Sequence, residues 1–370
     1  MIRIILSGGG TGGHIYPAVA VAEALKRRYE DNVEILFVGA EGKMEMEKVP
    51  ALGYNIVGLP VVGLYRKLTL SHLTLPFKVV ASVRRAKRII KEFGADIVVG
   101  FGGYASAPIL WAAQRLGVPT VIQEQNSYAG LTNKLLSKRA KRICVSYDNM
   151  GRFFPEERVV MTGNPLRGHF SATEGSRSEA LKYYGFSDAL PVVLVVGGSL
   201  GTRTLNEMMK AWILSLNGTA PVQVIWQTGK YYEQEMREFL GAHPTQNIWQ
   251  GAFIERMDYA YTAADVVLSR SGACTVSELC LVAKPTIFVP SPNVAEDHQT
   301  KNAMALVERG AAEIVRDSEA IEQGMRKAVE LAHDEHRLEE LSANIAQLAI
   351  SDSAERVVKI IAEVLAEAKR

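Results

Sequence analysis

The stretch Ser7-Gly8-Gly9-Gly10-Thr11-Gly12-Gly13-His14 directly follows Ile2 to Leu6, an apolar run typical of a buried strand. Five glycines in six positions let the backbone turn sharply and approach a ligand closely. We expect a helix to begin just after it, near Tyr16-Pro17, and the amides at a helix start favour an anion or a developing oxyanion. His14 is the first titratable side chain after the glycines. The stretch therefore predicts a strand–loop–helix unit that carries a ligand site.

The same glycines partly match two nucleotide-binding motifs. Gly8-x-Gly10-x-x-Gly13 fits the dinucleotide fingerprint, but Glu41 comes later than the usual spacing of ~20 residues. The P-loop motif is excluded because no Gly-Lys-Ser/Thr follows the glycines. A nicotinamide- or flavin-dependent oxidoreductase stays open as an alternative.

Composition indicates a globular protein with room for two domains of ordinary size. The chain has 370 residues, 48% hydrophobic and 22% charged, with a net charge of +2 that gives no nucleic-acid signature. The three cysteines, Cys144, Cys274 and Cys280, lack metal-ligand spacing and are expected to pack as small apolar residues in a reducing compartment. We expect no signal peptide and no transmembrane segment, since no apolar run approaches ~18 residues.

The first half of the chain alternates strand-like and helix-like segments. The strand-like segments are rich in Val and Ile with little alternation, as in strands buried on both faces. They cover residues 2–6, 33–38, 54–59, 97–100, 120–123 and 142–145, and predicted helices cover 18–28, 44–52, 73–93, 107–116 and 131–137. The cluster Met161-Thr162-Gly163-Asn164-Pro165 then predicts a turn or hinge, and a polar stretch follows it.

The second half repeats the plan. A strand at 192–196 leads into another glycine loop, Gly197-Gly198-Ser199-Leu200-Gly201. Further strands are expected at 222–227, 248–250, 265–268, 285–289 and 313–315, and helices at 204–216, 231–240, 257–263, 275–283, 299–309, 320–331, 335–349 and 354–369.

This duplication predicts an α/β protein of two Rossmann-like, doubly wound domains that face a central cleft. We expect an N-terminal domain of residues 1–163 and a C-terminal domain of residues 164–350, with the helix of residues 352–370 as a candidate to pack back on the first. Ligands bind at the carboxyl edge of such sheets, so both glycine loops are expected at one cleft that closes on substrate.

A second constellation, Ser269-Arg270-Ser271-Gly272-Ala273-Cys274-Thr275-Val276-Ser277-Glu278, directly follows a strand. Small residues before a helix start near Thr275 suit a phosphate, with hydroxyl donors from Ser271 and Thr275. Glu278 can accept hydrogen bonds from a ribose diol. The equally weighted alternative is an ordinary capping box with Glu278 as its third-position carboxylate.

Two further loops follow strands in this half. Phe253-Ile254-Glu255-Arg256-Met257 offers backbone groups to a base edge and apolar covers for its face, although plain core packing is the commoner role of Phe and Met. The polar run of residues 293–302 is placed to contact substrate hydroxyls, or else is a solvated helix start capped by Asp297. Asp-x-Asp occurs nowhere in the chain, so a diphosphate would be met by helix ends, hydroxyls and Arg167.

Six motifs taken in order give a specific resemblance over nearly the whole chain. They are Gly9–His14, Gly102-Gly103-Tyr104, Glu124-Gln125-Asn126, Gly163-Asn164-Pro165-Leu166-Arg167, Gly197-Gly198-Ser199 and Ser269–Ala273. Together they resemble the MurG family within glycosyltransferase family 28. The resemblance implies the GT-B arrangement and the inverting transfer of N-acetylglucosamine from UDP-GlcNAc to the muramyl 4-hydroxyl of the acceptor lipid I, forming lipid II in peptidoglycan synthesis.

The resemblance also implies roles for single residues. Ile254 would meet the uracil through its backbone, Glu278 would hold the ribose, and Gln299 and Asn126 would contact the sugar. Thr11, Gly12 and Gly13 would approach from the first domain with the acceptor, near Tyr104. The diphosphate would be contacted by Arg167, Ser199, Ala273, Cys274, Thr275, Val276 and Ser277. The family often has two glutamines where this chain has His298-Gln299, which leaves contacts at the first position open.

His14 is the candidate general base for the acceptor hydroxyl, since an imidazole titrates near neutral pH. The alternative is that His14 only orients the acceptor or holds the loop. No tightly bound cofactor is expected, and assistance by a divalent cation stays open because no protein ligand motif is present.

A lipid-linked acceptor needs a membrane face. Residues 64–78 mix apolar and cationic side chains, with Leu73, Leu75, Phe77 and Lys78 as candidates, and Arg84, Arg85, Lys87, Arg88 and Lys91 follow. This pattern suits an anionic bilayer, although a helix packed on a sheet explains part of it. We expect a peripheral protein at the cytoplasmic face of the cell membrane, with cell-wall and division enzymes as further candidate partners. A non-catalytic sugar-nucleotide sensor is the remaining alternative.

Overall fold

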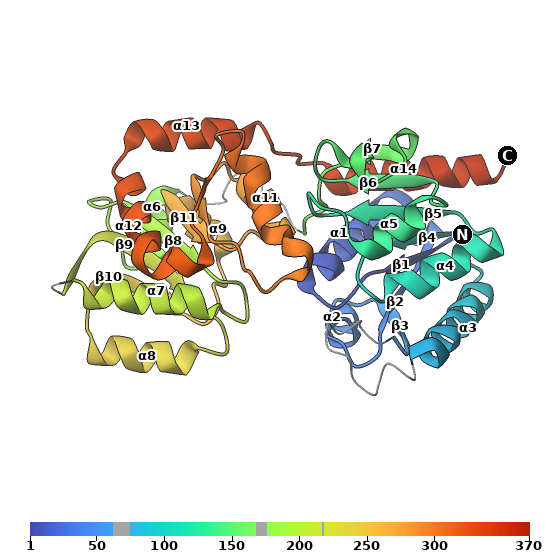
Figure 1. Cartoon of the computed structure of the whole chain (residues 1–370), viewed down its shortest axis with the longest axis horizontal. Helices are drawn as coiled ribbons and strands as arrows, with labels where there is room; N and C mark the ends of the chain where they lie inside the picture. The colour runs from blue at the N-terminus through green and yellow to red at the C-terminus, as the bar shows by residue number, and fades with distance from the viewer. Residues whose placement is uncertain (62–74, 168–175, 217) are drawn as a thin grey trace. The chain divides into compact units, whose positions relative to one another are not determined.

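The computed structural model describes residues 1–61, 75–167, 176–216 and 218–370, the side chains of residues 75–78 excepted. The chain forms two compact units. One comprises Met1–Gly168 together with Asp352–Arg370, and the other comprises His169–Ser351 (Figure 1). Of the predicted membrane segment of residues 64–78, residues 64–74 lie outside the described residues.

Within the described residues, the first unit contains a seven-stranded parallel sheet of order β3-β2-β1-β4-β5-β6-β7. Parallel neighbours require crossover connections, which the helices supply. The strands are β1 (Ile2–Ser7), β2 (Val33–Ala40), β3 (Asn55–Leu59), β4 (Ile97–Gly100), β5 (Thr120–Glu124), β6 (Arg142–Val145) and β7 (Val159–Met161). The helices are α1 (Gly12–Tyr29), α2 (Glu45–Ala51), α3 (Leu75–Phe93), α4 (Ser106–Leu116), α5 (Leu131–Ser137) and α14 (Ser353–Ala368).

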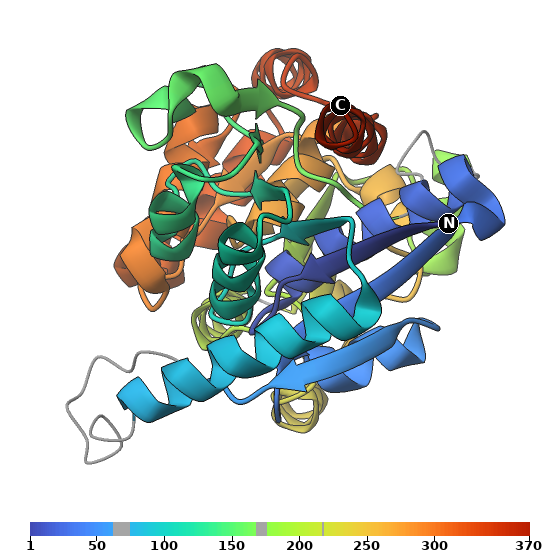
Figure 2. The ribbon, with the colours of Figure 1, turned by 90° about the vertical axis from the view of Figure 1, so that its right-hand side faces the viewer.

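Helices cover both faces of this sheet, as the continuous apolar strands predicted. Ile4 and Leu6 of β1 pack into the cluster formed with α1 and α14, whereas Ile5 packs into the cluster with α3, α4 and α5. Figure 2 shows α3 extending beside β3. Successive side chains of a strand point to opposite faces, so a strand with no polar alternation requires cover on both.

The last helix belongs to the first unit. Val357 and Ile361 of α14 are fully buried in the core that α1 also lines. Arg27 of α1 also pairs with Glu355 of α14 at 2.8 Å. The last helix of the chain therefore packs beside the first one. In Figure 1, α14 lies alongside β6.

The second unit repeats the layers around a parallel sheet that has six strands among its described residues, in the order β10-β9-β8-β11-β12-β13. The strands are β8 (Val192–Val196), β9 (Thr219–Gln227), β10 (Gln246–Gly251), β11 (Val266–Ser269), β12 (Thr286–Phe288) and β13 (Glu313–Ile314). The helices are α6 (Arg177–Tyr183), α7 (Arg203–Leu214), α8 (Glu233–Ala242), α9 (Met257–Ala263), α10 (Ala273–Leu281), α11 (His298–Val307), α12 (Ala320–Ala332) and α13 (Glu335–Ala346). Trp226, fully buried, anchors the core beneath α7 and α12.

The sequence-based prediction omitted two elements. β7 has only three residues, and its last residue, Met161, is also the first residue of the predicted turn. Helix α6 was missed although a capping box marks it: the Ser176 side chain accepts from the Glu179 amide, and Glu179 bonds back to Ser176.

Candidate active site

The first glycine loop enters its helix earlier than predicted. Thr11 is the N-cap in an extended conformation, and α1 begins at Gly12 instead of near Tyr16-Pro17. The Thr11 carbonyl accepts the amides of His14 and Ile15 at 3.2 and 3.3 Å, which closes the first turn. Pro17 is the sixth residue of the helix, so its missing N–H leaves the Gly13 carbonyl without the usual helical donor. The amides of Gly12 and Gly13 thus belong to the helix N-terminus, where an anion is favoured.

His14 is held in one tautomer by the loop itself. Its Nδ1 lies 2.9 Å from the Gly9 carbonyl oxygen, with the Thr11 hydroxyl oxygen at 3.3 Å. A carbonyl only accepts, so we assign the proton to Nδ1. The lone pair of the neutral ring is then on Nε2, which is the arrangement a general base needs.

Two glycines after β4 make room for this ring. A Cβ at Gly102 would lie 3.2 Å from the His14 Nε2, and one at Gly103 would lie 2.4 Å from the Gly9 carbonyl oxygen. Both glycines have positive φ, +90° and +79°. Tyr104, predicted near the acceptor, follows them with 51% of its surface exposed.

A buried carboxylate that the sequence-based prediction missed supports the loop. Glu45 of α2 is 0% exposed; its Oε2 accepts the Gly10 amide and its Oε1 the Ala40 amide, each at 3.0 Å. Glu41, the acid of the dinucleotide alternative, instead pairs with Arg85 at 2.5 Å. No local pattern distinguishes Glu45 from its exposed neighbours, because its partners lie in the loop after β1 and at the end of β2.

A second buried carboxylate positions Asn126, the predicted sugar contact. Glu124 Oε1 accepts from the backbone and side-chain amides of Asn126 at 3.1 and 3.2 Å. Its Oε2 accepts from Asn133 Nδ2 at 2.8 Å and from the Gly130 amide at 3.0 Å. Gln125 reaches across to the Phe101 carbonyl at 2.8 Å, so the loops after β4 and β5 are tied together.

Arg167, predicted to contact the diphosphate, lies at the end of the first unit. Its Nε is 3.3 Å from a Glu23 oxygen on α1, and its side chain is exposed. The structure thus places it among first-unit residues, and its diphosphate contact stays a prediction.

In the second unit, the glycine loop after β8 packs against the loop after β9. A Cβ at Gly229 would lie 2.0 Å from the Gly201 Cα, so both positions require glycine. The Ser199 carbonyl accepts the Lys230 amide at 3.1 Å, while the Ser199 side chain is exposed. The structure therefore fixes the Ser199 backbone and leaves its hydroxyl at the surface.

Helix α10 presents an open N-terminus. Gly272 is the N-cap and forms no side-chain cap, so the helix begins with backbone amides that point out of its N-terminal end, among them those of Ala273 and Thr275. Ser271, expected to add a hydroxyl donor for phosphate, is fully buried and donates to the Gln299 carbonyl at 2.8 Å. That expectation is wrong, because the hydroxyl ties α10 to α11 instead. Ser277 donates to the Ala273 carbonyl at 3.0 Å, and Val276 is buried.

Glu278 is not a capping-box residue, because α10 begins at Ala273 and places it nearly two turns inside. The Tyr261 hydroxyl donates to its Oε2 at 3.4 Å. Burial raises the pKa of Glu278 to about 7, and the Tyr261 hydrogen bond opposes this shift only in part. The carboxylate is therefore poorly solvated, and donors from a ribose diol would stabilise its charged form.

In the loop after β10, the two residues expected to contact the uracil differ in exposure. Ile254 is buried, and its amide donates to Gln227 Oε1 at 3.2 Å. Phe253 is 59% exposed, so core packing is wrong for this residue. The Tyr184 hydroxyl donates to the Arg256 carbonyl at 3.1 Å, which anchors the loop from α6.

Gln299, the second residue of α11, uses its side chain to hold the backbone of the run before this helix. Gln299 Oε1 accepts the Ser291 amide at 2.9 Å. Asp297 is the N-cap residue, but its carboxylate accepts from the Thr300 hydroxyl at 2.7 Å and not from a helix amide. The alternative of an Asp297 side-chain cap is therefore wrong.

Metal-ligand clusters and membrane-spanning helices are both absent from the part of the chain that the structure describes. There, no group of three or more His, Cys, Asp or Glu side chains is arranged to hold a metal ion. In the same part, none of the helices is both long and apolar enough to span a bilayer. Of the predicted membrane residues, Leu73 and the side chains of Leu75, Phe77 and Lys78 lie outside this part.

Comparison with protein families matches both units. Residues 4–145 match the glycosyltransferase family 28 N-terminal domain, and residues 192–357 match the glycosyltransferase family 28 C-terminal domain. The two matches cover the sheets and helices that carry the glycine loops.

Similar proteins agree over their full lengths. The chain is 54% identical to a Porphyromonas gingivalis (strain ATCC BAA-308 / W83) protein over 100% of this chain and 97% of that protein, and 47% identical to a Flavobacterium psychrophilum protein over 99% of each. Both are named UDP-N-acetylglucosamine–N-acetylmuramyl-(pentapeptide) pyrophosphoryl-undecaprenol N-acetylglucosamine transferase. The crystal structure of Acinetobacter baumannii MurG superposes with a TM-score of 0.77 at 30% identity, covering 98% of this chain and 100% of that one. The calicheamicin glycosyltransferase CalG4, at 18% identity and a TM-score of 0.71, shares the fold.

Proposed function

The chain belongs to glycosyltransferase family 28, and on that premise we propose that it transfers N-acetylglucosamine from UDP-N-acetylglucosamine to the lipid-linked N-acetylmuramyl-pentapeptide acceptor, forming lipid II in peptidoglycan synthesis. The observation that carries this proposal is the 54% identity, over the entire chain, with a relative named for that reaction. The site geometry agrees with this transfer, which needs a general base beside the acceptor and an anion-binding site for the donor's diphosphate.

On the acceptor side, His14 is proposed as the general base. Its Nε2 takes the proton of the muramyl 4-hydroxyl as the hydroxyl oxygen forms a bond to the anomeric carbon of the sugar. The bond from that carbon to the diphosphate oxygen breaks, and its electron pair leaves with UDP. Attack opposite the leaving group inverts the anomeric configuration. The Nδ1–H bond to the Gly9 carbonyl supports this role, because it leaves the lone pair on Nε2.

On the donor side, the second unit is proposed to hold UDP-N-acetylglucosamine. The N-terminal amides of α10, among them those of Ala273 and Thr275, suit the diphosphate, which gains negative charge as the bond breaks. Glu278 suits the ribose, and the exposed ring of Phe253 suits the face of the uracil, since an exposed aromatic ring can stack on a base. We propose that these groups stabilise the leaving charge without a cofactor bound by the protein itself.

A membrane face is proposed on α3 and α4, where the acceptor's lipid chain would lie. Val79 and Val80 of α3 are exposed, and Trp111 of α4 is 38% exposed with Arg115 at 4.9 Å and Lys87 at 5.8 Å from its ring. Aromatic and cationic side chains of this kind favour the interface of an anionic bilayer.

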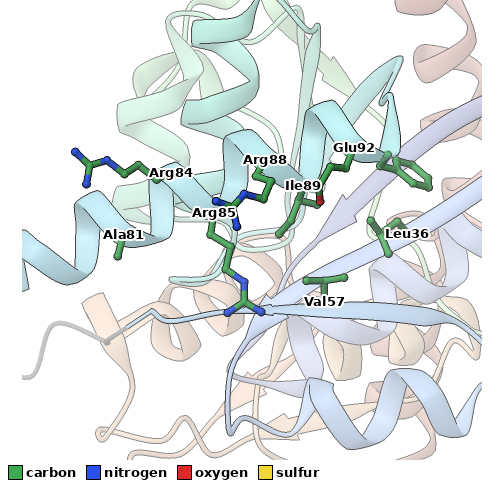
Figure 3. Close-up of a pocket in the computed structure, with 9 residues that line it drawn as sticks. Leu36, Val57, Ala81, Arg84, Arg85, Arg88, Ile89 and Glu92 are labelled. Carbon is green, nitrogen blue, oxygen red and sulfur yellow. The ribbon is translucent and has the colours of Figure 1, made fainter.

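A groove beside α3 extends the cationic surface. Figure 3 shows Arg84, Arg85 and Arg88 along one side, with apolar residues of β2 and β3 beneath. Arg85 is engaged by Glu41, whereas Arg84 and Arg88 are exposed on the helix. Because the donor is a cytoplasmic nucleotide sugar, we propose that this face binds the cytoplasmic leaflet.

The test is turnover with defined substrates. The protein is incubated with UDP-N-acetylglucosamine and a lipid-linked muramyl-pentapeptide acceptor, and release of UDP is measured together with the glycosylated lipid. Acceptor-dependent formation of both products is expected. Binding of UDP-N-acetylglucosamine without turnover would favour a sensor, and calorimetric binding of NAD in place of UDP would favour an oxidoreductase.

A further inference from the structure

Glu45 is a buried carboxylate that the proposed mechanism does not use. It is 0% exposed, and both oxygens accept backbone amides. Burial of a carboxylate is costly unless donors satisfy its charge. Such a group, placed against the glycine loop, therefore requires an explanation beyond helix packing.

The explanation lies in one peptide group. The amide of Gly10 donates to Glu45 Oε2 at 3.0 Å, and the carbonyl of Gly9 accepts from His14 Nδ1 at 2.9 Å. These two groups belong to the same peptide bond. In a planar trans peptide the N–H and the C=O point in opposite directions, so this peptide stands directly between the carboxylate and the imidazole.

We propose that Glu45 is a positioning residue that acts on His14 through the Gly9–Gly10 peptide. A carboxylate on the N–H polarises the peptide and makes its carbonyl oxygen a stronger acceptor, since hydrogen bonds in a chain strengthen one another by ~10–30%. The stronger acceptor holds the proton on His14 Nδ1 and keeps the Nε2 lone pair toward the acceptor. In many active sites a carboxylate bonds directly to the histidine Nδ1–H and fixes its tautomer. Here a peptide group stands between the carboxylate and the histidine and has the same effect.

The glycines around this relay have the same explanation. A Cβ at Gly9 would lie 2.1 Å from Glu45 Oε1, and a Cβ at Gly39 would lie 2.6 Å from Glu45 Cγ. Neither position can carry a side chain while the carboxylate lies there. Gly103 closes the other side, where a Cβ would come within 2.4 Å of the Gly9 carbonyl oxygen. The Gly9 side of the peptide is thus packed between Glu45 and Gly103, whereas Gly10 is exposed.

The first test reads the tautomer of His14 by NMR and needs no turnover. The side-chain nitrogens are labelled with ¹⁵N, and the His14 signals among the seven histidines are assigned with His14→Gln. In the native protein the neutral ring is expected to carry its proton on Nδ1. A native ring that carries it on Nε2 overturns the proposal without any Glu45 variant being made.

Glu45→Gln keeps the shape of the side chain and removes its charge. The amide replaces one carboxylate oxygen by an NH2 group, which donates, so one of the two amides of Gly10 and Ala40 then faces a donor instead of an acceptor. We expect the Nε2–H tautomer of His14 to increase severalfold in this variant. Glu47→Gln is the matched control, because Glu47 lies exposed on the same helix and undergoes the same charge change. An unchanged tautomer ratio in folded Glu45→Gln overturns the relay.

Kinetics form the second test and rest on the proposed function. In Glu45→Gln we expect kcat to fall by about tenfold, a modest share of what general-base catalysis contributes, while KM for UDP-N-acetylglucosamine stays within about twofold. Glu45→Asp retains the charge, although its shorter side chain places the carboxylate farther from the Gly10 amide, and it is expected to keep more of kcat than Glu45→Gln. A folded Glu45→Gln with native kcat refutes the relay, whereas failure of native protein to turn over refutes the proposed function and leaves the tautomer result standing.

Discussion

The Glu278→Gln variant should gain stability relative to the native chain as the pH rises. The quantity compared is the free energy of unfolding of the second unit. Burial raises the pKa of Glu278 from 4.5 to about 7. The folded state therefore binds the proton more tightly than the unfolded state. The stabilising contribution is complete below pH 4.5 and is lost as pH rises toward about 7.

The size of the effect follows from the two pKa values. Their difference of about 2.5, at 1.36 kcal/mol for each unit, amounts to at most about 3 kcal/mol of unfolding free energy. Gln carries no proton equilibrium, so the variant lacks this pH dependence. The stability of Glu278→Gln relative to native protein should increase by up to about 3 kcal/mol between about pH 4.5 and pH 8. Comparing the two proteins across pH removes any constant packing effect of the amide.

Urea denaturation followed by tryptophan fluorescence provides the assay. Trp212, Trp226 and Trp249 lie in the second unit and only Trp111 in the first, so the signal reports mainly on the unit that contains Glu278. The midpoints should separate as pH rises, with an unchanged slope. Parallel pH profiles for the two proteins would refute the claim that burial shifts this carboxyl.

Donor affinity provides an independent reading of the same group. If the ribose donates to the Glu278 carboxylate, UDP-N-acetylglucosamine binds the deprotonated protein, and its affinity should fall about tenfold for each pH unit below about 7. The sugar nucleotide is used because its diphosphate keeps its charge in this range. Glu278→Gln should bind more weakly and show no such slope, and an identical slope would assign the titration to another group.

Three further changes test other parts of the site. His14→Gln should lower kcat by at least about 100-fold with donor affinity nearly unchanged, measured by UDP release and calorimetry, and the opposite pattern would rule out the base role. Gly103→Ala should lower the thermal midpoint and abolish turnover, because its Cβ would lie 2.4 Å from the Gly9 carbonyl oxygen. Gly42→Ala has a similar positive φ but open space around its Cβ, so it should cost only about 1 kcal/mol of unfolding free energy. Equal losses of stability in the two variants would refute the steric argument. Arg84→Gln together with Arg88→Gln should weaken binding to anionic vesicles by about 1 kcal/mol per charge, and undiminished flotation with such vesicles would place the membrane face elsewhere.

The sequence predicts the parallel sheets well because their strands are buried on both faces. The apolar runs at β1, β4 and β8 have no polar alternation, and turn residues bound each of them. The confirmed fold follows from the repeated order of these segments. Short elements are less visible: β7 has three residues, and only the capping box of Ser176 and Glu179 marks α6.

The sequence predicted those site residues that lie in or next to the loops at the ends of strands. His14 and Ser269–Glu278 follow directly from strand ends, so their edge of the sheet could be inferred. Glu45 could not, because its partners Gly10 and Ala40 meet it only after β1, β2 and α2 have assembled. The partner of Arg167, which is Glu23, likewise depends on packing across the first unit.

The glycines divide into two groups that the sequence alone does not separate. At Gly9, Gly102 and Gly103 the space of a missing Cβ is taken by Glu45, by His14 or by backbone, so these glycines serve the internal geometry of the site. At Gly10 and Gly198 a Cβ would meet no described atom within 4 Å, and both residues have a φ of +84°. At positions of the second kind the space of the missing Cβ is open to a ligand. Substituting Gly9 should therefore disturb the ring of His14 before any substrate is present, whereas a side chain at Gly198 should act mainly on the bound donor.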